Sequence, residues 1–136
     1  MDREPLRVQV VAADREVWSG DAVNVIARTT EGDIGILPGH EPLMAVLVPS
    51  VAEIVGADGR TRIMAVDGGF ISVAQGRVSI LSQEVQRAEE ISPERAEREV
   101  AELEVLRNQG ATTDSQEHRL HILKAQIRAA ERVRDK

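Results

Sequence analysis

The 136-residue sequence contains no cysteine, no tyrosine and only two aromatic residues, Trp18 and Phe70. Without cysteine it has no disulfide framework, no thiolate zinc site, no iron–sulfur cluster and no cysteine nucleophile. Two aromatic rings are too few for the base-stacking platforms of proteins that bind single-stranded nucleic acid. The core is therefore expected to consist of valine, isoleucine, leucine, alanine and methionine.

An excess of positive charge and long hydrophobic runs are also absent. The formal net charge is −6, from 17 basic and 23 acidic residues, which argues against broad binding to the phosphate backbone of nucleic acid. No apolar run approaches the ~20 residues of a membrane-spanning helix, and the initial segment MDREPLRVQVV shows no signal-peptide pattern. We expect a soluble, cytosolic protein with no direct insertion into a membrane.

Up to about residue 86, apolar and polar residues alternate, as in Leu6-Val8-Val10, where Arg7 and Gln9 separate the apolar positions. Short β-branched runs punctuated by glycine and proline predict an all-β sandwich or barrel. Asp58-Gly59 and Gln75-Gly76 are predicted hairpin turns, because these pairs tolerate the positive φ angles of tight turns. Asp67-Gly68-Gly69-Phe70 is predicted to be a turn before a strand.

After Arg87 the apolar period becomes helical. Ser92 and Pro93 predict a helix start, because serine caps free amides and proline needs no N–H partner in the first turn. Asn108-Gln109-Gly110 predicts its end, and Thr112 to Ser115 supplies a second cap. Each predicted helix has one apolar face: Ala96, Val100, Leu103 and Leu106 in the first, and Leu120, Leu123, Ile127 and Ala130 in the second. We therefore predict a β-sandwich domain over residues 1–86 and a two-helix antiparallel hairpin over residues 87–136, with helices at about 93–108 and 115–133.

Charge is divided unevenly between the predicted helices. Residues 88–117 carry nine acidic and three basic groups, whereas residues 118–136 carry two acidic and six basic groups, a net charge of +4. Two explanations remain open: attraction between the two helices, or a basic final helix that binds an acidic partner.

The segment from Arg28 to Leu43 is rich in glycine, proline and charge, but it matches no catalytic motif. Its glycines are not followed by the lysine and Ser/Thr of a phosphate-binding loop. Its potential metal ligands include a single histidine, and the later pair His118 and His121 lacks a third ligand. The sequence also lacks a G-x-S-x-G string, so we predict no catalytic site and no metal site. Glu31 and His40 suit an interface with another protein.

Three strings resemble the epsilon subunit of bacterial F-type ATP synthase: Glu31-Gly-Asp-Ile-Gly-Ile-Leu-Pro-Gly-His-Glu-Pro-Leu43, Asp67-Gly-Gly-Phe-Ile-Ser-Val73 and Val78-Ser-Ile-Leu81. The resemblance covers essentially the whole chain. It implies a non-catalytic subunit in the central stalk of the proton-translocating complex, at the cytoplasmic face of the bacterial cell membrane. The implied partners are the gamma subunit, the membrane rotor ring of c subunits and the alpha/beta catalytic hexamer.

The resemblance also assigns interface and regulatory residues. The residues expected to contact gamma and the rotor ring are Glu31, Gly32, Asp33, Pro38, Gly39 and His40. In the family the helical hairpin is mobile: it packs on the sandwich when folded, and it reaches the catalytic hexamer and inhibits ATP hydrolysis when extended. The basic residues expected to meet an acidic loop of that hexamer are Arg119, Lys124, Arg128, Arg132 and Arg134.

Some family members bind ATP between the hairpin helices through an Ile-Asp-x-x-Arg-Ala string. The corresponding residues here would be Ile91, Arg95 and Ala96, together with Arg128 and Arg132 of the second helix. Ser92 replaces the aspartate, and Gln86 and Glu102 replace a glutamate and an arginine, which makes the site less favourable for a triphosphate. No resident cofactor is expected, and the alternative function is an ATP-sensing module in which bound nucleotide holds the hairpin folded.

Overall fold

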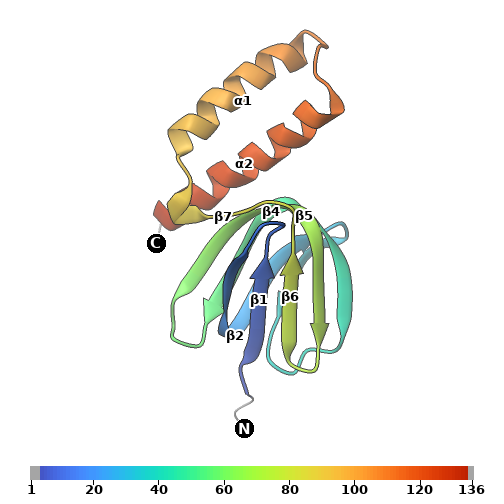
Figure 1. Cartoon of the computed structure of the whole chain (residues 1–136), viewed down its shortest axis with the longest axis vertical. Helices are drawn as coiled ribbons and strands as arrows, with labels where there is room; N and C mark the ends of the chain where they lie inside the picture. The colour runs from blue at the N-terminus through green and yellow to red at the C-terminus, as the bar shows by residue number, and fades with distance from the viewer. Residues whose placement is uncertain (1–3, 135–136) are drawn as a thin grey trace.

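The computed structural model describes residues 4–134, which form a β-sandwich with a helical hairpin across one end (Figure 1). This architecture confirms the predicted fold class. The strands are β1 (Leu6–Val11), β2 (Glu16–Thr29), β3 (Gly32–Ile36), β4 (Leu43–Gly56), β5 (Thr61–Ala74), β6 (Arg77–Leu81) and β7 (Val85–Arg87). A 3₁₀ turn η1 (Ala88–Glu90) leads into helices α1 (Pro93–Asn108) and α2 (Asp114–Arg134). Strand β7 spans the predicted domain boundary after residue 86.

The strands form a sheet that closes on itself. Its order is β1-β6-β5-β4-β2-β3, and β1 also pairs with β2. The β1–β6 pairing is parallel, and the other pairings are antiparallel. Closure leaves few unpaired edges, and a short strand, β3, forms one of them.

Alternation along the strands builds the aliphatic core, as predicted. In β1, Leu6, Val8 and Val10 are fully buried, whereas Arg7 and Gln9 are exposed. The opposing strands contribute Val25, Ile36, Ile54, Met64, Ile71 and Ile80 to the same cluster. Trp18 packs at its margin and is only partly buried, so the sandwich interior contains no fully buried aromatic ring among the residues that the structure describes.

Both predicted hairpin turns are present, but the predicted turn at Asp67–Phe70 is wrong. Gly59 has φ +85°, and Gln75 and Gly76 have φ +53° and +77°. Gly68 and Gly69, with φ +113° and +102°, instead lie inside the continuous strand β5. They mark the point where the neighbour of β5 changes from β7 to β6. A glycine backbone bends there without leaving the ladder with β4.

The helix ends follow the predicted caps. The Arg95 amide donates to Ser92 Oγ at 3.4 Å, and Gly110 ends the first helical segment with φ +68°. At the start of α2, the Gln116 amide donates to Thr113 Oγ1 at 3.1 Å, and the Thr113 amide donates to Gln116 Oε1 at 2.9 Å. This reciprocal pair is a capping box.

Helix α2 lies between α1 and the sandwich, so it buries two faces (Figure 1). Leu120 and Leu123 pack with Ala96 and Leu103 of α1. A second face, formed by small residues, packs on the outer side of β4 and β5: Ala125, Ala129 and Ala130 contact the cluster of Val51, Ile63 and Ala65. Ala130 was expected on the leucine face, and it lies on the sandwich face because α2 has a layer on each side. The hairpin is therefore in the folded arrangement. Within residues 4–134, no helix has both the length and the hydropathy needed to cross a membrane.

Candidate functional site

A tight turn between β2 and β3 presents Glu31 to solvent. The hydroxyl of the buried Thr29 accepts a hydrogen bond from the Glu31 amide at 3.1 Å and donates one to the Gly32 carbonyl at 2.8 Å. Gly32 has φ +116°, a conformation that favours glycine. The turn therefore fixes the backbone around Glu31 while its side chain projects outward.

Asp33 is the second residue of the edge strand β3 and pairs with Arg28 of β2. Arg28 Nε donates to Asp33 Oδ1 at 2.7 Å, and Nη2 donates to Oδ2 at 3.4 Å. The Arg28 hydrogen bond holds the pKa of Asp33 below its usual value. Asp33 is thus a charged, oriented group on an exposed edge.

Pro38, Gly39 and His40 lie in the loop that follows β3. The His40 amide donates to the Leu37 carbonyl at 3.0 Å, and Gly39 has φ +87°. His40 Nδ1 lies 2.7 Å from the Glu41 carbonyl oxygen, so this nitrogen is the donor. Five strand residues, about 16 Å of extended chain, separate this loop from the Glu31 turn. The six predicted interface residues therefore form two groups at opposite ends of β3.

Four exposed apolar residues of the sandwich lie elsewhere, on β4, β5 and β6. Val46 pairs with Phe70, and Phe70 pairs with Leu81 across the next strand. Met44 lies two residues before Val46, on the same face of β4. We call these four residues the apolar row; their exposed fractions are 74% for Met44, 47% for Val46, 51% for Phe70 and 50% for Leu81. A surface groove of about 280 Å³ adjoins Phe70 and Leu81.

Sequence reasoning missed the apolar row, although it contains one of the two aromatic residues. Both faces of β5 carry apolar side chains, so the alternation alone did not show which face another layer covers. A large aromatic residue directly beside two glycines was the available signal, since glycines allow close backbone approach while the ring projects from the sheet.

Arg119 and Lys124 of α2 pair with acidic groups of α1 in the folded hairpin. Lys124 Nζ lies 3.0 Å from Glu104 of α1, and Arg119 Nε donates to Glu99 of α1 at 2.8 Å. A further interhelical pair joins Arg107 and Glu117 at 3.6 Å. Attraction between oppositely charged helices is therefore at least part of the reason for the uneven charge distribution.

Arg128 and Arg132 face the sandwich rather than α1. Arg132 Nη1 lies 3.7 Å from Glu53 Oε2 on β4. Among the described residues, no carboxylate lies within ion-pair distance of Arg128, and burial lowers its pKa, with Arg28 and Arg132 adding repulsion. These arginines line a pocket of about 110 Å³ that also contains Asp33. The side chain of Arg134 lies outside the described residues.

The residues considered for nucleotide binding divide between two places. Arg95 and Ala96 line a pocket of about 160 Å³ between the hairpin helices, together with Ser92, Gln86 and Arg119. Arg128 and Arg132 line the separate pocket against β2 and β4. Arg119 and Arg128 are nine residues apart, or about 13 Å along the helix, so different turns of α2 line the two pockets. Ile91 is buried with Ala88 and Ala125.

The helix pocket is electrically balanced. Glu90 and Glu99 line it beside Arg95 and Arg119. Glu99 already accepts two hydrogen bonds from Arg119, which lower the pKa of its carboxyl. A phosphate there must compete with a carboxylate for the same guanidinium.

Metal ligands do not converge anywhere in residues 4–134: no group of three or more acidic or histidine side chains is close enough to hold an ion. His118 and His121 are both exposed on α2.

The fold is a closed β-sandwich that carries a folded helical hairpin, and an exposed apolar row of this kind is typical of surfaces at which proteins bind one another. A family model for the beta-sandwich domain of the ATP synthase delta/epsilon chain matches residues 5–88. The ATP synthase epsilon chain of Cutibacterium acnes (strain DSM 16379 / KPA171202) is 47% identical over 138 residues, covering 96% of this chain and 94% of that protein. The epsilon chain of Streptomyces avermitilis is 53% identical over 95 residues, covering 70% and 77%. The chain belongs to the ATP synthase epsilon chain family, and it is a subunit of that complex that is not itself catalytic.

Two solved structures share the fold. A chain of the Euglena gracilis mitochondrial ATP synthase, solved as OSCP/F1/c-ring, superposes with a TM-score of 0.79 at 21% identity, covering 100% of this chain and 84% of that one. A chain from the central stalk and c-ring of the Tetrahymena thermophila mitochondrial enzyme has a TM-score of 0.56 at 13% identity, covering 98% of both. At these identities the likeness concerns the fold alone.

Proposed function

We propose that this chain is the central-stalk subunit through which the gamma subunit and the rotor ring of c subunits are coupled in a proton-translocating ATP synthase. Its complex lies at the cytoplasmic face of a bacterial cell membrane, and the chain is peripheral to that membrane. The observation that carries the proposal is the apolar row on β4, β5 and β6, because an exposed apolar surface of this kind marks a protein interface.

The apolar row suits the gamma subunit. Phe70 lies between Val46 and Leu81 in the strand register, so a partner that covers it also covers its neighbours. Complete burial of a fully exposed side chain of this size contributes about 1.5–3 kcal/mol, so a half-exposed one such as Phe70 has about half of that to gain. Aromatic residues near the centre of an interface often contribute most to binding. The exposed groups at the two ends of β3, Glu31 to Asp33 and Pro38 to His40, are assigned to polar contacts with gamma and the rotor ring.

The hairpin is assigned a regulatory role, inhibition of ATP hydrolysis by extension toward the alpha/beta hexamer. Arg119, Lys124 and Arg132 have acidic partners within the folded chain. Extension therefore exchanges internal carboxylates for those of an acidic loop on the hexamer. Arg128 lacks an internal carboxylate within ion-pair distance in the described part of the chain. Among the basic residues of α2 whose side chains the structure describes, it is therefore the one most available to such a loop. Competing partners of this kind make a two-state equilibrium.

The pocket between α1 and α2 supports a second candidate function, ATP sensing. Arg95 and Arg119 bring two guanidinium groups to it, and Ser92 adds a hydroxyl. Nucleotide bound there would hold the hairpin folded. Calorimetry with ATP and magnesium tests this function: heat that disappears in Arg95→Gln supports it, and no heat at millimolar nucleotide rejects it.

Co-purification with gamma tests the docking proposal. Phe70→Asp places a charge in the apolar row and is expected to abolish stable association with gamma. Val105→Asp is the matched control, because Val105 is 56% exposed on α1, away from the apolar row. Val105→Asp should retain gamma. Equal retention by both variants, or a wild-type chain that does not associate with gamma, rejects the proposal.

A further inference from the structure

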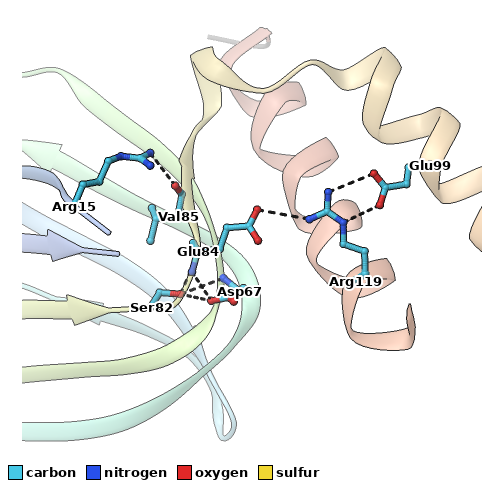
Figure 2. Close-up of polar contacts among 7 residues, drawn as sticks. All are labelled: Arg15, Asp67, Ser82, Glu84, Val85, Glu99 and Arg119. Carbon is cyan, nitrogen blue, oxygen red and sulfur yellow. Dashed lines mark hydrogen bonds and ion pairs between the residues drawn. The ribbon is translucent and has the colours of Figure 1, made fainter. Parts of the chain in front are cut away.

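Arg119 of α2 contacts carboxylates from two other parts of the chain (Figure 2). Its Nε and Nη2 donate to the two oxygens of Glu99 in α1, at 2.8 and 3.3 Å. Its Nη1 lies 3.6 Å from Glu84 Oε1, in the segment between β6 and β7. One guanidinium therefore joins α2, α1 and the sandwich.

The backbone that carries Glu84 is held by the sandwich (Figure 2). The Glu84 amide donates to Asp67 Oδ1 at 3.1 Å, and Ser82 Oγ donates to the same oxygen at 2.6 Å. Arg15 Nη2 donates to the Val85 carbonyl at 3.2 Å. These contacts come from β5 and from the β1–β2 turn. They fix the backbone at Glu84, and so they position its side chain for the contact with Arg119.

Glu99 orients the guanidinium from the other side. Two parallel hydrogen bonds to one carboxylate fix the plane of an arginine side chain. With that plane fixed, the remaining Nη1 group is directed toward Glu84. Glu99 thus positions the contact, and Glu84 completes the link to the sandwich.

The Arg119–Glu84 contact matters because the apolar contact between α2 and the sandwich is made by small residues. Ala125, Ala129 and Ala130 supply the apolar contact, and alanine buries less apolar area than leucine. Two ion pairs between described side chains join α2 to the sandwich, Arg119–Glu84 and Arg132–Glu53. They are thirteen residues, about 20 Å, apart along the helix, so they hold its two ends.

We propose that the Arg119–Glu84 pair is a latch that holds the helical hairpin on the sandwich, and that the pair must break before α2 can leave. The proposal rests on the proposed function only in that the hairpin moves. Arg119 and Glu84 side chains are 38% and 41% exposed. A pair in this environment is weak and is screened by salt, which suits a latch that opens reversibly.

A cysteine-labelling experiment on the full chain tests the latch. Because the sequence has no cysteine, Ala129→Cys introduces a single thiol at a position that is fully buried against the sandwich. Its rate of reaction with a thiol reagent reports how often α2 leaves the sandwich. Glu84→Gln in this background is expected to raise the rate about 2- to 5-fold at low salt, and the increase should shrink in 1 M salt, where the Debye length is about 3 Å.

The matched control is Glu104→Gln. The Glu104–Lys124 pair has similar exposure, but it joins α2 to α1 and not to the sandwich. This control should leave the labelling rate unchanged. An equal effect of Glu84→Gln and Glu104→Gln, or no effect of Glu84→Gln, overturns the latch.

A double-mutant cycle separates the latch from a general loss of stability. If Glu84 and Arg119 act as a pair, Glu84→Gln has no further effect on labelling in an Arg119→Gln chain. Additive effects overturn the proposal.

If Ala129→Cys perturbs packing, Ala125→Cys provides a second buried reporter on the same face. Labelling needs no gamma subunit, so its failure is distinct from a failure of gamma to associate.

Discussion

Arg62 lies over the ring of Trp18, with its guanidinium carbon 5.1 Å from the ring centroid. It also forms hydrogen bonds with Asp58 in the β4–β5 turn. Arg62 Nη1 and Nη2 donate to the two Asp58 oxygens at 2.8 and 2.9 Å. Arg62 thus connects the only tryptophan of the chain to the hairpin turn that follows β4.

Asp58 is expected to titrate far below an ordinary aspartate. The Arg62 hydrogen bond and the Arg60 amide, which donates at 3.0 Å, lower the pKa of Asp58 to about 2. Because the folded-state pKa is below the unfolded value of 3.8, the stabilisation is present above pH 3.8 and is lost as the pH falls toward 2. Carboxyl NMR titration checks this value. In Arg62→Gln the pKa should rise toward 3.8, and an unchanged pKa would contradict the assignment.

Gly69 is predicted to tolerate no side chain. It has φ +102°, and a Cβ at this position would overlap the carbonyl oxygen of Leu81. Gly69→Ala should therefore lower the free energy of unfolding by about 2–4 kcal/mol. Gly76→Ala is the control: φ is +77°, but no atom lies within 4 Å of the added Cβ, and the loss should be about 1 kcal/mol. Urea unfolding of both variants measures the difference, and equal losses would contradict the steric explanation.

Substitutions at Leu123 and Leu81 are predicted to have different effects: the first weakens packing of the hairpin, and the second weakens binding to gamma. Leu123 is 1% exposed between the helices, so Leu123→Ala should weaken hairpin packing by about 2–5 kcal/mol, while association with gamma persists. Leu81 is 50% exposed, so Leu81→Ala should leave hydrogen exchange of the helices unchanged and weaken gamma binding. The reverse pattern would contradict the proposed division of roles.

Removal of residues 88–136 is expected to leave a folded sandwich. The truncation uncovers Val51, Ile63 and Ala65 on the outer face, but the main core of the sandwich draws on no helix residue. A cooperative thermal transition in the β-sheet circular dichroism signal would support the boundary predicted after residue 86. An unfolded truncated chain would place the boundary elsewhere.

The basic residues of α2 are predicted to act through charge. Neutralising Arg128, Arg132 and Arg134 should weaken inhibition of ATP hydrolysis, and the loss should be larger at low salt than at high salt because exposed charges are screened. Arg98→Gln, on the exposed part of α1, is the control and should have little effect. ATPase assays of the reconstituted complex measure both. Equal loss at the two salt concentrations would argue against a charge contact.

Local features of the fold could be predicted because nearby residues generate them. Ser92 caps its own helix three residues on, and Asp58-Gly59 forms a turn between adjacent strands. The glycine pair at 68 and 69 could not be assigned in this way. Its positive φ angles resemble those of a turn, and only the arrival of β6 and β7 beside β5 keeps the chain extended there.

The candidate surfaces divide similarly. Glu31 and His40 are exposed as the sequence suggested, and their role as contacts with gamma and the rotor ring remains a prediction. The pairing of Arg119 with Glu84 joins residues 35 positions apart. No local pattern indicates such a pair, since its geometry depends on where α2 comes to rest.

The sequence by itself determined a β-sandwich followed by two helices, the caps of those helices and the family, because alternation, capping and motif spacing act over a few residues. Tertiary structure alone decided that Phe70 stays exposed while Ile71 is buried, and that α2 packs on both α1 and the sandwich. Alternation separates the two faces of a strand, but which face is covered depends on the layers that distant parts of the chain supply.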